Sequence, residues 1–361
     1  MGQTATGPIT EKESGSGCSA AKGLEWGYSK MQGWRPRMED AHFAVSSLEG
    51  PWADTAAFGV LDGHGGCEVA FFCERRLPKA IASNARSVPS EALALAIGSM
   101  DELLTKEIEY LRSFTGQWRE QPLDGASRVG CTAAVCLVQA DFIFVANVGD
   151  SRTVLARDNK AIALSEDHKP DLPKERERIH RAGGTVLEQQ VGDLRTFRVN
   201  GNLNVSRSIG DLYYKNDPLL APEDQLITSS PDIIEYQRSP KDQFLLIASD
   251  GVWDQISNQA AVDFVLRQLG RKPSDILEDL LNQCFAPDLS KTGGLGGDNM
   301  TAVLVLLNSE DNVSPSSLGS SPGVGVRMKK LPPLVEEACA ASGLGCTFLP
   351  ALCSVHTRCS L

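Results

Sequence analysis

The sequence lacks several features that would assign it to a specialised class of protein. Its 361 residues include ten cysteines but no C-x-x-C pair, and no uninterrupted apolar run approaches the roughly 20 residues that a membrane-spanning helix needs. The N-terminus is polar and has no apolar segment typical of a secretory signal. We therefore expect free thiols in a reducing compartment, with the protein in the cytoplasm or the nucleus.

Positive charge is also in short supply. The 35 Lys and Arg residues are outnumbered by 46 Asp and Glu residues, for a net charge of −11. This balance argues against a basic face for nucleic acid, so we expect no nucleic-acid partner. Hydrophobic residues at 42% and charged residues at 22% are typical of a globular protein. The acidic excess then has two interpretations, general solubility or the binding of cations, and the placement of the acids must distinguish them.

Composition divides the chain into three parts. Residues 1–23 are rich in Gly, Ser and Thr and predict a disordered arm. Residues 24–308 carry the regular hydrophobic patterns and predict the folded domain. Residues 309–361 predict a flexible linker followed by a weakly ordered tail. The tail holds Cys339, Cys346, Cys353 and Cys359, but their spacing is not that of zinc ligands.

The folded part alternates irregularly between strand and helix patterns. Short, continuously apolar runs predict buried strands, and helical periodicity marks four longer stretches. Two of the strands, joined through Gln139 and Ala140, predict a hairpin, which favours antiparallel sheets with helices outside, an α+β fold. The predicted strands are 56–62, 131–138, 141–150, 243–250 and 301–308, and the predicted helices are 68–77, 90–111, 174–182 and 258–282, the last interrupted by Pro273.

Four aspartates stand at the ends of predicted buried strands, each beside a glycine. These are Asp62, Asp150, Asp250 and Asp298. One Asp-Gly pair is usually only a turn. Four such acids at rigid strand ends instead predict a preorganised site, because glycine lets backbone and ligand approach closely.

Carboxylates that converge repel one another unless a cation neutralises them. Oxygen ligands without Cys or His favour Mg²⁺ or Mn²⁺, and Glu39 and Asp40 are candidates to add ligands through water. Two such cations can activate a water for phosphoryl transfer. Arg35 is the candidate phosphate anchor, and His64, two residues from Asp62, is the candidate general acid.

At these residues the sequence resembles the type 2C, or PPM, family of metal-dependent protein phosphatases. The resemblance covers about residues 24–308. The motifs that carry it occur in the family's order: GWRPRMEDAH (33–42), FGVLDGHGG (58–66), GCTA (130–133), ANVGDSR (146–152), LSEDHKP (164–170), ERIHRAGG (177–184), LNVSRSIGD (203–211), LLIASDGVWD (245–254) and GDNMTAVLV (297–305).

The resemblance implies a four-layer αββα sandwich, in which two antiparallel sheets are flanked by helices. It also implies hydrolysis of phosphoserine and phosphothreonine in protein substrates by a water that two metal ions activate. The implied metal ligands are Asp62, the Gly63 carbonyl, Asp250 and Asp298, with Glu39 and Asp40 acting through waters. Arg35 matches the phosphate-binding arginine and His64 the proposed general acid.

The resemblance further implies a weaker third metal site and a mobile segment beside the active site. Asp150, Asp250 and Asp254 correspond to the third site, and residues 166–230 match the segment, called the flap in this family. Asn204 departs from the small residue that the family often has there, which leaves the metal ligands untouched.

Two other functions are compatible with such a domain. A pseudophosphatase would bind partners without catalysis, but it would lack ligands, and every matched acid is present. A hydrolase of small phosphate esters or nucleotides is the second alternative, although no G-x-x-x-x-G-K-[ST] phosphate cradle occurs. We expect a monomer.

The first six residues fit the N-myristoylation pattern M-G-x-x-x-[ST], with Gly2 as acceptor and Thr6 as the hydroxyl residue. A single myristoyl chain gives only reversible membrane binding. The motif therefore predicts weak membrane association of a fraction of an otherwise cytoplasmic protein.

Overall fold

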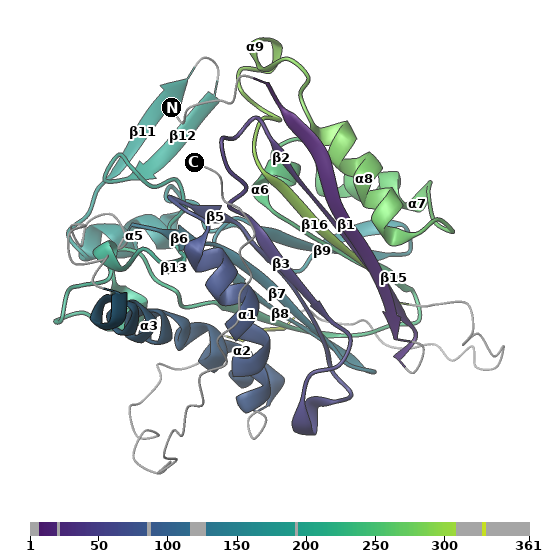
Figure 1. The fold of residues 1–361 in the computed structure, drawn as a ribbon, viewed down its shortest axis with the longest axis horizontal. Coiled ribbons are helices and arrows are strands. Elements are labelled where there is room, and N and C mark those ends of the chain that lie inside the picture. The colour runs from purple at the N-terminus through teal and green to yellow at the C-terminus, as the bar shows by residue number, and fades with distance from the viewer. Residues whose placement is uncertain are drawn as a thin grey trace. The chain divides into compact units, whose positions relative to one another are not determined.

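Two six-stranded antiparallel sheets form the centre of the fold (Figure 1). The computed structural model describes residues 7–19, 22–84, 88–115, 128–191, 194–307 and 327–329. All of these belong to one compact unit that ends at Lys330. Sheet A has the order β1 (Ile9–Ser19), β2 (Leu24–Gly33), β16 (Met300–Leu306), β15 (Asp242–Ala248), β9 (Arg152–Arg157) and β10 (Lys160–Ala163).

Sheet B has the order β17 (Arg327–Lys329), β14 (Asp232–Gln237), β8 (Phe142–Val148), β7 (Ala133–Val138), β4 (Ala56–Leu61) and β3 (Ala41–Val45). Strands β7 and β8 pair in antiparallel register, with Ala133 opposite Val148. The hairpin predicted through Gln139 and Ala140 is therefore confirmed.

Helices cover the outer face of each sheet. Helices α6 (Asp250–Trp253), α7 (Asn258–Leu266) and α8 (Pro273–Cys284) pack on sheet A, and α1 (Glu68–Ser83) and α2 (Pro89–Gly98) pack on sheet B. Helix α3 (Met100–Thr115) contacts α1 and α2. The predicted α+β sandwich, with two antiparallel sheets between helical layers, is confirmed. Among the described residues, the other helices are α5 (Pro173–Arg181) and α9 (Leu289–Thr292), with short 3-10 turns at Gly50–Trp52, Leu212–Tyr214 and Pro222–Asp224.

Strand β15 shows why the predicted strands are apolar without interruption. Leu245 and Ile247 point between the sheets, into a core shared with Phe58 of sheet B. Phe244 and Leu246 point the other way, into the core beneath the α7 and α8 layer. Because both faces of the strand are buried from Phe244 onward, hydrophobic residues occupy every position from Phe244 to Ala248 rather than alternate ones.

Two smaller sheets lie beside the sandwich. Strands β13 (Ile209–Gly210), β6 (Gly130–Cys131) and β5 (Gly63–His64) form a three-stranded sheet, and β11 (Val186–Val191) pairs with β12 (Leu194–Val199) as a separate hairpin (Figure 1). A small core of its own supports the 166–230 segment. It contains Ile179, Val199, Leu203, Val205, Tyr214 and Ile227.

The predicted helix 90–111 is divided in two, whereas the interruption predicted at Pro273 is confirmed. The stretch 90–111 forms α2 and α3, and Ser99 lies between the end of α2 at Gly98 and the start of α3 at Met100. The stretch 258–282 forms α7 and α8, and α8 begins at Pro273. Proline is favourable in a first turn because the N–H that it lacks would have no partner within the helix there.

Two segments outside the predicted folded domain of residues 24–308 form strands of the sheets. Residues 9–19, assigned to a disordered arm, form the edge strand β1, which pairs with β2. Gly15 and Gly17 leave room there for the rings of Tyr28 and Trp26, a cross-strand fit that composition does not reveal. Residues 327–329, assigned to a flexible linker, form β17 on the edge of β14, where unpaired backbone groups of an edge strand are available. The tail cysteines lie outside the described residues.

No helix in the described part of the chain is long and apolar enough to cross a membrane.

Candidate active site

The predicted acids lie at the ends of strands in both sheets. Asp62 follows β4, Asp150 follows β8, Asp250 begins α6 directly after β15, and Asp298 precedes β16. These four strand ends lie close enough together for the carboxylates to affect one another's ionisation.

Desolvation raises the pKa of Asp62 well above its usual range, and the charges of Asp40, Asp250, Asp298 and Asp150 raise it further. Asp250 behaves in the same way, since desolvation and the charges of Asp150 and Asp298 raise its pKa well above the usual value. Such mutual repulsion is what a cation would relieve.

Asp40 is the most enclosed of the predicted ligands. Its side chain is 1% exposed, and Ser249 Oγ donates to its Oδ2 at 3.0 Å. Its Oδ1 is buried and has no hydrogen-bond partner among the described residues. Burial, with a contribution from the charge of Asp298, raises the pKa of Asp40 to about 7. A buried carboxylate oxygen without a donor fits a role beside a cation or its water.

The described residues include no group of three or more His, Cys, Asp or Glu side chains already arranged to hold a metal ion. A Mg²⁺-type cation keeps several waters and is bound through one or two carboxylates. The donors present, all oxygens, therefore fit Mg²⁺ or Mn²⁺ with much of the coordination supplied by water.

Glu39 and Gly63 approach each other closely. A Cβ atom added at Gly63 would lie 2.3 Å from the Glu39 carbonyl oxygen, so only glycine fits this position. The backbone N–H of Glu39 donates to Asn299 Oδ1 at 2.8 Å, and Asn299 Nδ2 also donates to the carbonyls of Gln32 and Arg37. Asn299, which the sequence analysis did not single out, thus holds the 32–39 segment against the start of β16.

Arg35 reaches the carboxylates from an exposed loop. Its Nη2 donates to Asp298 Oδ2 at 2.5 Å, and its side chain is 50% exposed. Although desolvation opposes the charge, Asp298, Asp250 and Asp62 raise the pKa of Arg35. The guanidinium is therefore a permanent positive charge at the rim of the acidic cluster.

The region of the predicted third metal site already contains a cation from the protein. Lys169 Nζ forms an ion pair with the buried Asp150 Oδ2. Burial lowers the pKa of Lys169, but the charges of Asp150 and Asp250 outweigh this effect, and the net shift is upward. Partial desolvation of the Asp254 carboxyl and the charges of Asp150 and Asp167 outweigh the effect of Lys169 and raise the pKa of Asp254. Lys169 was not identified from the sequence, although it lies in the quoted LSEDHKP motif.

His64 belongs to the three-stranded sheet and pairs with a carboxylate. Its Nε2 lies 2.6 Å from Asp211 Oδ2. Desolvation lowers the pKa of His64, but the charge and hydrogen bond of Asp211 outweigh it and the net shift is upward. Asp211 was also not identified from the sequence, although it is the last residue of the LNVSRSIGD motif.

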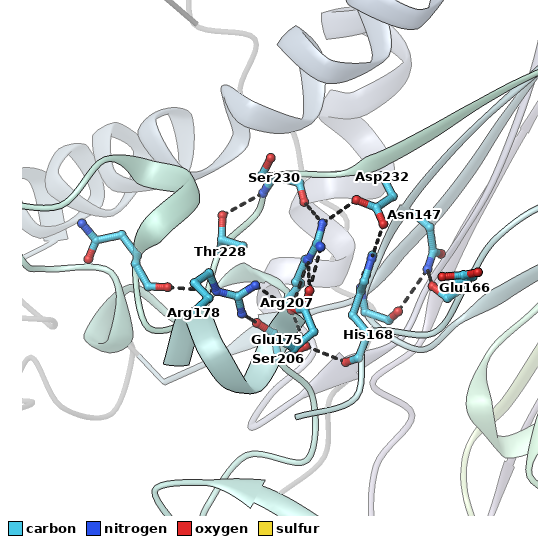
Figure 2. Close-up of polar contacts among 12 residues, drawn as sticks. Asn147, Glu166, His168, Glu175, Arg178, Ser206, Arg207, Thr228, Ser230 and Asp232 are labelled. Carbon is cyan, nitrogen blue, oxygen red and sulfur yellow. Dashed lines mark hydrogen bonds and ion pairs between the residues drawn. The ribbon is translucent and has the colours of Figure 1, made fainter. Parts of the chain in front are cut away.

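A buried ionic cluster fastens the 166–230 segment to sheet B (Figure 2). Glu175 on α5 accepts from Arg178 Nη1 at 2.6 Å and from Arg207 Nη2 at 2.7 Å. Arg207 Nη1 also donates to Asp232 Oδ1, at the start of β14, at 2.9 Å. The cluster therefore connects the 166–230 segment to β14, and β14 pairs with β8, the strand that precedes Asp150.

His168 completes this cluster on the side of Asp150. Its Nδ1 accepts from the backbone N–H of Gly149 at 3.1 Å, so the proton of the neutral ring is on Nε2, which lies 3.2 Å from Asp232 Oδ2. The turn that carries Asp150 is thus held from both sides, by His168 and by Lys169.

A surface hollow of about 250 Å³ lies on the 166–230 segment, and its lining includes Tyr213, Tyr214 and Leu220 but none of the predicted site residues. The candidate catalytic and metal-binding residues lie at the strand ends and do not line this hollow.

Comparison with known proteins points in the same direction. Residues 24–293 match the family described as "Protein phosphatase 2C". The chain is 41% identical over 318 residues to "Probable protein phosphatase 2C 3" of Paramecium tetraurelia, across 85% of this chain and 99% of that protein. It is 42% identical over 313 residues to "Protein phosphatase 2C homolog 2" of Schizosaccharomyces pombe, across 84% of this chain and 78% of that protein.

A solved structure shares the fold. The "Crystal structure of serine-threonine phosphatase 2C from Toxoplasma gondii" superposes with a TM-score of 0.64 at 21% identity, across 84% of this chain and 98% of that chain.

Proposed function

Because the chain belongs to the protein phosphatase 2C family, we propose that it hydrolyses phosphoserine and phosphothreonine in protein substrates. The observation that supports this most directly is the grouping of Asp62, Asp250 and Asp298 around the guanidinium of Arg35. A permanent cation at the rim of a carboxylate cluster suits an anionic phosphate ester, because guanidinium matches phosphate oxygens in bidentate fashion.

The acids would hold divalent cations. Asp62, the Gly63 carbonyl, Asp250 and Asp298 are the proposed direct ligands, and Glu39 and Asp40 the ligands through water, with Mg²⁺ or Mn²⁺ as the ion. When bound, such cations lower the pKa of a water and neutralise phosphate charge. The orphaned oxygen of Asp40 and the raised pKa of Asp62 support this assignment.

A third, weaker cation at Asp150, Asp250 and Asp254 is part of the same proposal. It would have to share Asp150 with Lys169. We infer that, because of this competition, a cation at this third site binds with lower affinity than the cations held by Asp62.

The remaining groups act on the substrate itself. Arg35 binds and orients the phosphate. His64 supplies a proton to the serine or threonine oxygen as that oxygen leaves, which matters because an alkoxide is a poor leaving group. The 25% exposure of the His64 side chain gives it access to a bound substrate.

The test is turnover of a phosphothreonine peptide beside a panel of nucleotides and small phosphate esters, in Mn²⁺ and in chelator. We expect rapid release of phosphate from the peptide, dependent on the cation. Turnover of nucleotides alone would indicate a small-ester hydrolase, and binding without turnover of any substrate would indicate a pseudophosphatase. Full activity after exhaustive chelation would contradict the metal assignment.

A further inference from the structure

The geometry points to Asp211 as the residue that positions His64 for proton donation, an inference that rests on the proposed function. The two residues are 147 positions apart, and Asp211 Oδ2 lies 2.6 Å from His64 Nε2. Asp211 is 1% exposed and His64 is 25% exposed, so the carboxylate supports the imidazole from the interior.

The three-stranded sheet brings the pair together. Strand β6 is central, with His64 of β5 opposite Gly130 on one side and Gly210 of β13 opposite the same glycine on the other. Asp211 follows Gly210 directly. The backbone pairing therefore sets His64 and Asp211 on either side of one residue.

That residue has to be glycine. A Cβ atom at Gly130 would lie 2.3 Å from Asp211 Oδ2 and 2.6 Å from His64 Nε2. Any side chain there would separate the imidazole from the carboxylate. Gly130 thus makes room for this contact, in addition to forming the strand.

Asp211 is itself held in a special backbone conformation. Its φ is 49°, in the left-handed region that few residues other than glycine, Asn and Asp adopt readily. Its N–H donates to the Val129 carbonyl at 2.9 Å, and Ser208 Oγ donates to its Oδ2 at 2.6 Å. These contacts, from the residue before β6 and from the residue before β13, hold Asp211 in place before any substrate binds.

Helix α3 anchors the strand that carries Asp211. Asp101 Oδ1 accepts from the Gly210 N–H at 2.7 Å, and its Oδ2 lies 2.6 Å from Lys215 Nζ, which also donates to the Ser208 carbonyl. The chain of contacts runs from α3 through β13 to His64. A rigid support of this kind is what a proton donor needs to remain aligned.

The contact also selects the nitrogen that acts. Nε2 is engaged by Asp211, and no described residue hydrogen-bonds Nδ1. In the proposed step a water oxygen bonds to phosphorus and releases a proton to solvent while the P–O bond to the substrate oxygen breaks. The Nδ1 proton of His64 moves to that departing oxygen. Nε2 keeps its own proton, which it donates to Asp211 Oδ2, and Nδ1 regains a proton from solvent. A carboxylate that holds an imidazole by its other nitrogen has this orienting role in other hydrolases.

The experiment compares Asp211→Asn, His64→Gln and the double variant on a phosphothreonine peptide and on p-nitrophenyl phosphate, whose leaving group needs little protonation. Asn tolerates the left-handed backbone, so the fold should be kept. We expect kcat on the peptide to fall by roughly 10–10²-fold in Asp211→Asn, a large share of the general-acid effect, with a much smaller loss on the aryl ester. The double variant should be no slower than His64→Gln alone.

Equal losses on both substrates, or a further loss in the double variant, would overturn the inference. Asp217→Asn, at an exposed position on the same segment, is the matched control and should behave as wild type. If Asp211→Asn fails to fold, Ser208→Ala provides the second test, with a smaller loss again confined to the peptide. Wild-type protein that leaves the peptide intact would refute the proposed function, whereas active wild type with an equally active Asp211→Asn variant would refute only the role of Asp211.

Discussion

Arg35 and Asp298 are 263 residues apart in the sequence, yet Arg35 Nη2 donates to Asp298 Oδ2 at 2.5 Å. Both side chains are substantially exposed, at 50% and 35%. Exposed pairs of this kind typically contribute between 0 and about 1 kcal/mol to stability. The pair therefore matters more for where it holds the guanidinium than for how much it stabilises the fold.

This geometry predicts a separation of activity from stability at Arg35. Arg35→Lys keeps the charge but loses the bidentate fork, so we expect KM for a phosphopeptide to rise roughly tenfold with little change in unfolding temperature. Steady-state kinetics and thermal unfolding measure the two effects. Arg76→Lys is the matched control, because Arg76 pairs with Glu107 at a similar exposure but away from the acids, and it should change neither quantity. Loss of stability without a change in KM would contradict the assignment of Arg35.

The acidic cluster predicts opposite effects of one substitution with and without metal. Asp62→Asn removes a charge that its neighbours repel, so in chelator the variant should be more stable than wild type by about 0.5–2 kcal/mol. Adding Mn²⁺ should stabilise wild type, by about 2.7 kcal/mol at 100 times its Kd, and stabilise the variant much less.

Thermal unfolding with and without Mn²⁺ measures both effects. Asp250→Asn should behave in the same way, and both variants should lose turnover. Asp171→Asn, at an exposed position, is the control and should respond to Mn²⁺ as wild type does. If Mn²⁺ stabilised Asp62→Asn as much as wild type, Asp62 would be an ordinary turn residue and not a metal ligand.

The cluster around Glu175 predicts loss of stability in acid. Burial opposes ionisation, but Arg207 and Arg178 outweigh it and lower the pKa of Glu175 from 4.5 to about 2. A carboxylate with a lowered folded-state pKa contributes stability that is fully present above pH 4.5 and is lost as the pH falls towards 2. Chemical denaturation between pH 6 and 2 should show this loss, on top of that from other acids.

Glu175→Gln tests the assignment directly. It leaves two buried guanidinium groups without their shared partner, so we expect destabilisation of about 3–5 kcal/mol at neutral pH and a flatter acid dependence than wild type. Glu188→Gln breaks only an exposed pair with Arg195 and serves as the control. A Glu175→Gln variant with unchanged stability would show that the cluster holds the segment in place without stabilising it.

The N-terminal motif predicts acylation of Gly2, which lies outside the described residues. Mass spectrometry of the N-terminal peptide from eukaryotic cells should detect a myristoyl group, and Gly2→Ala should remove the membrane-associated fraction. An unmodified or acetylated Gly2 would rule out the anchor.

Local sequence pattern determined the strands of the sandwich and the acids at their ends. Continuous apolar runs predict strands buried on both faces. Such runs can be recognised in the sequence because they involve only residues adjacent along the chain. The positions of Asp62, Asp250 and Asp298 followed from them, and so did the hairpin of β7 and β8. Strand β1 was not predicted because its sequence is partly exposed and rich in Gly and Ser. Its glycines are explained only by the aromatic rings of β2 that pack against them.

The partners of the site residues were decided by the tertiary structure alone. Asp211 reaches His64, Lys169 reaches Asp150, and Arg207 reaches Glu175 through pairings that span 147, 19 and 32 residues. No local pattern encodes such contacts, because ionic and hydrogen-bonding geometry depends on where folded backbones meet. The sequence determined which groups are present, and the packing of sheets and loops decided which of them act together.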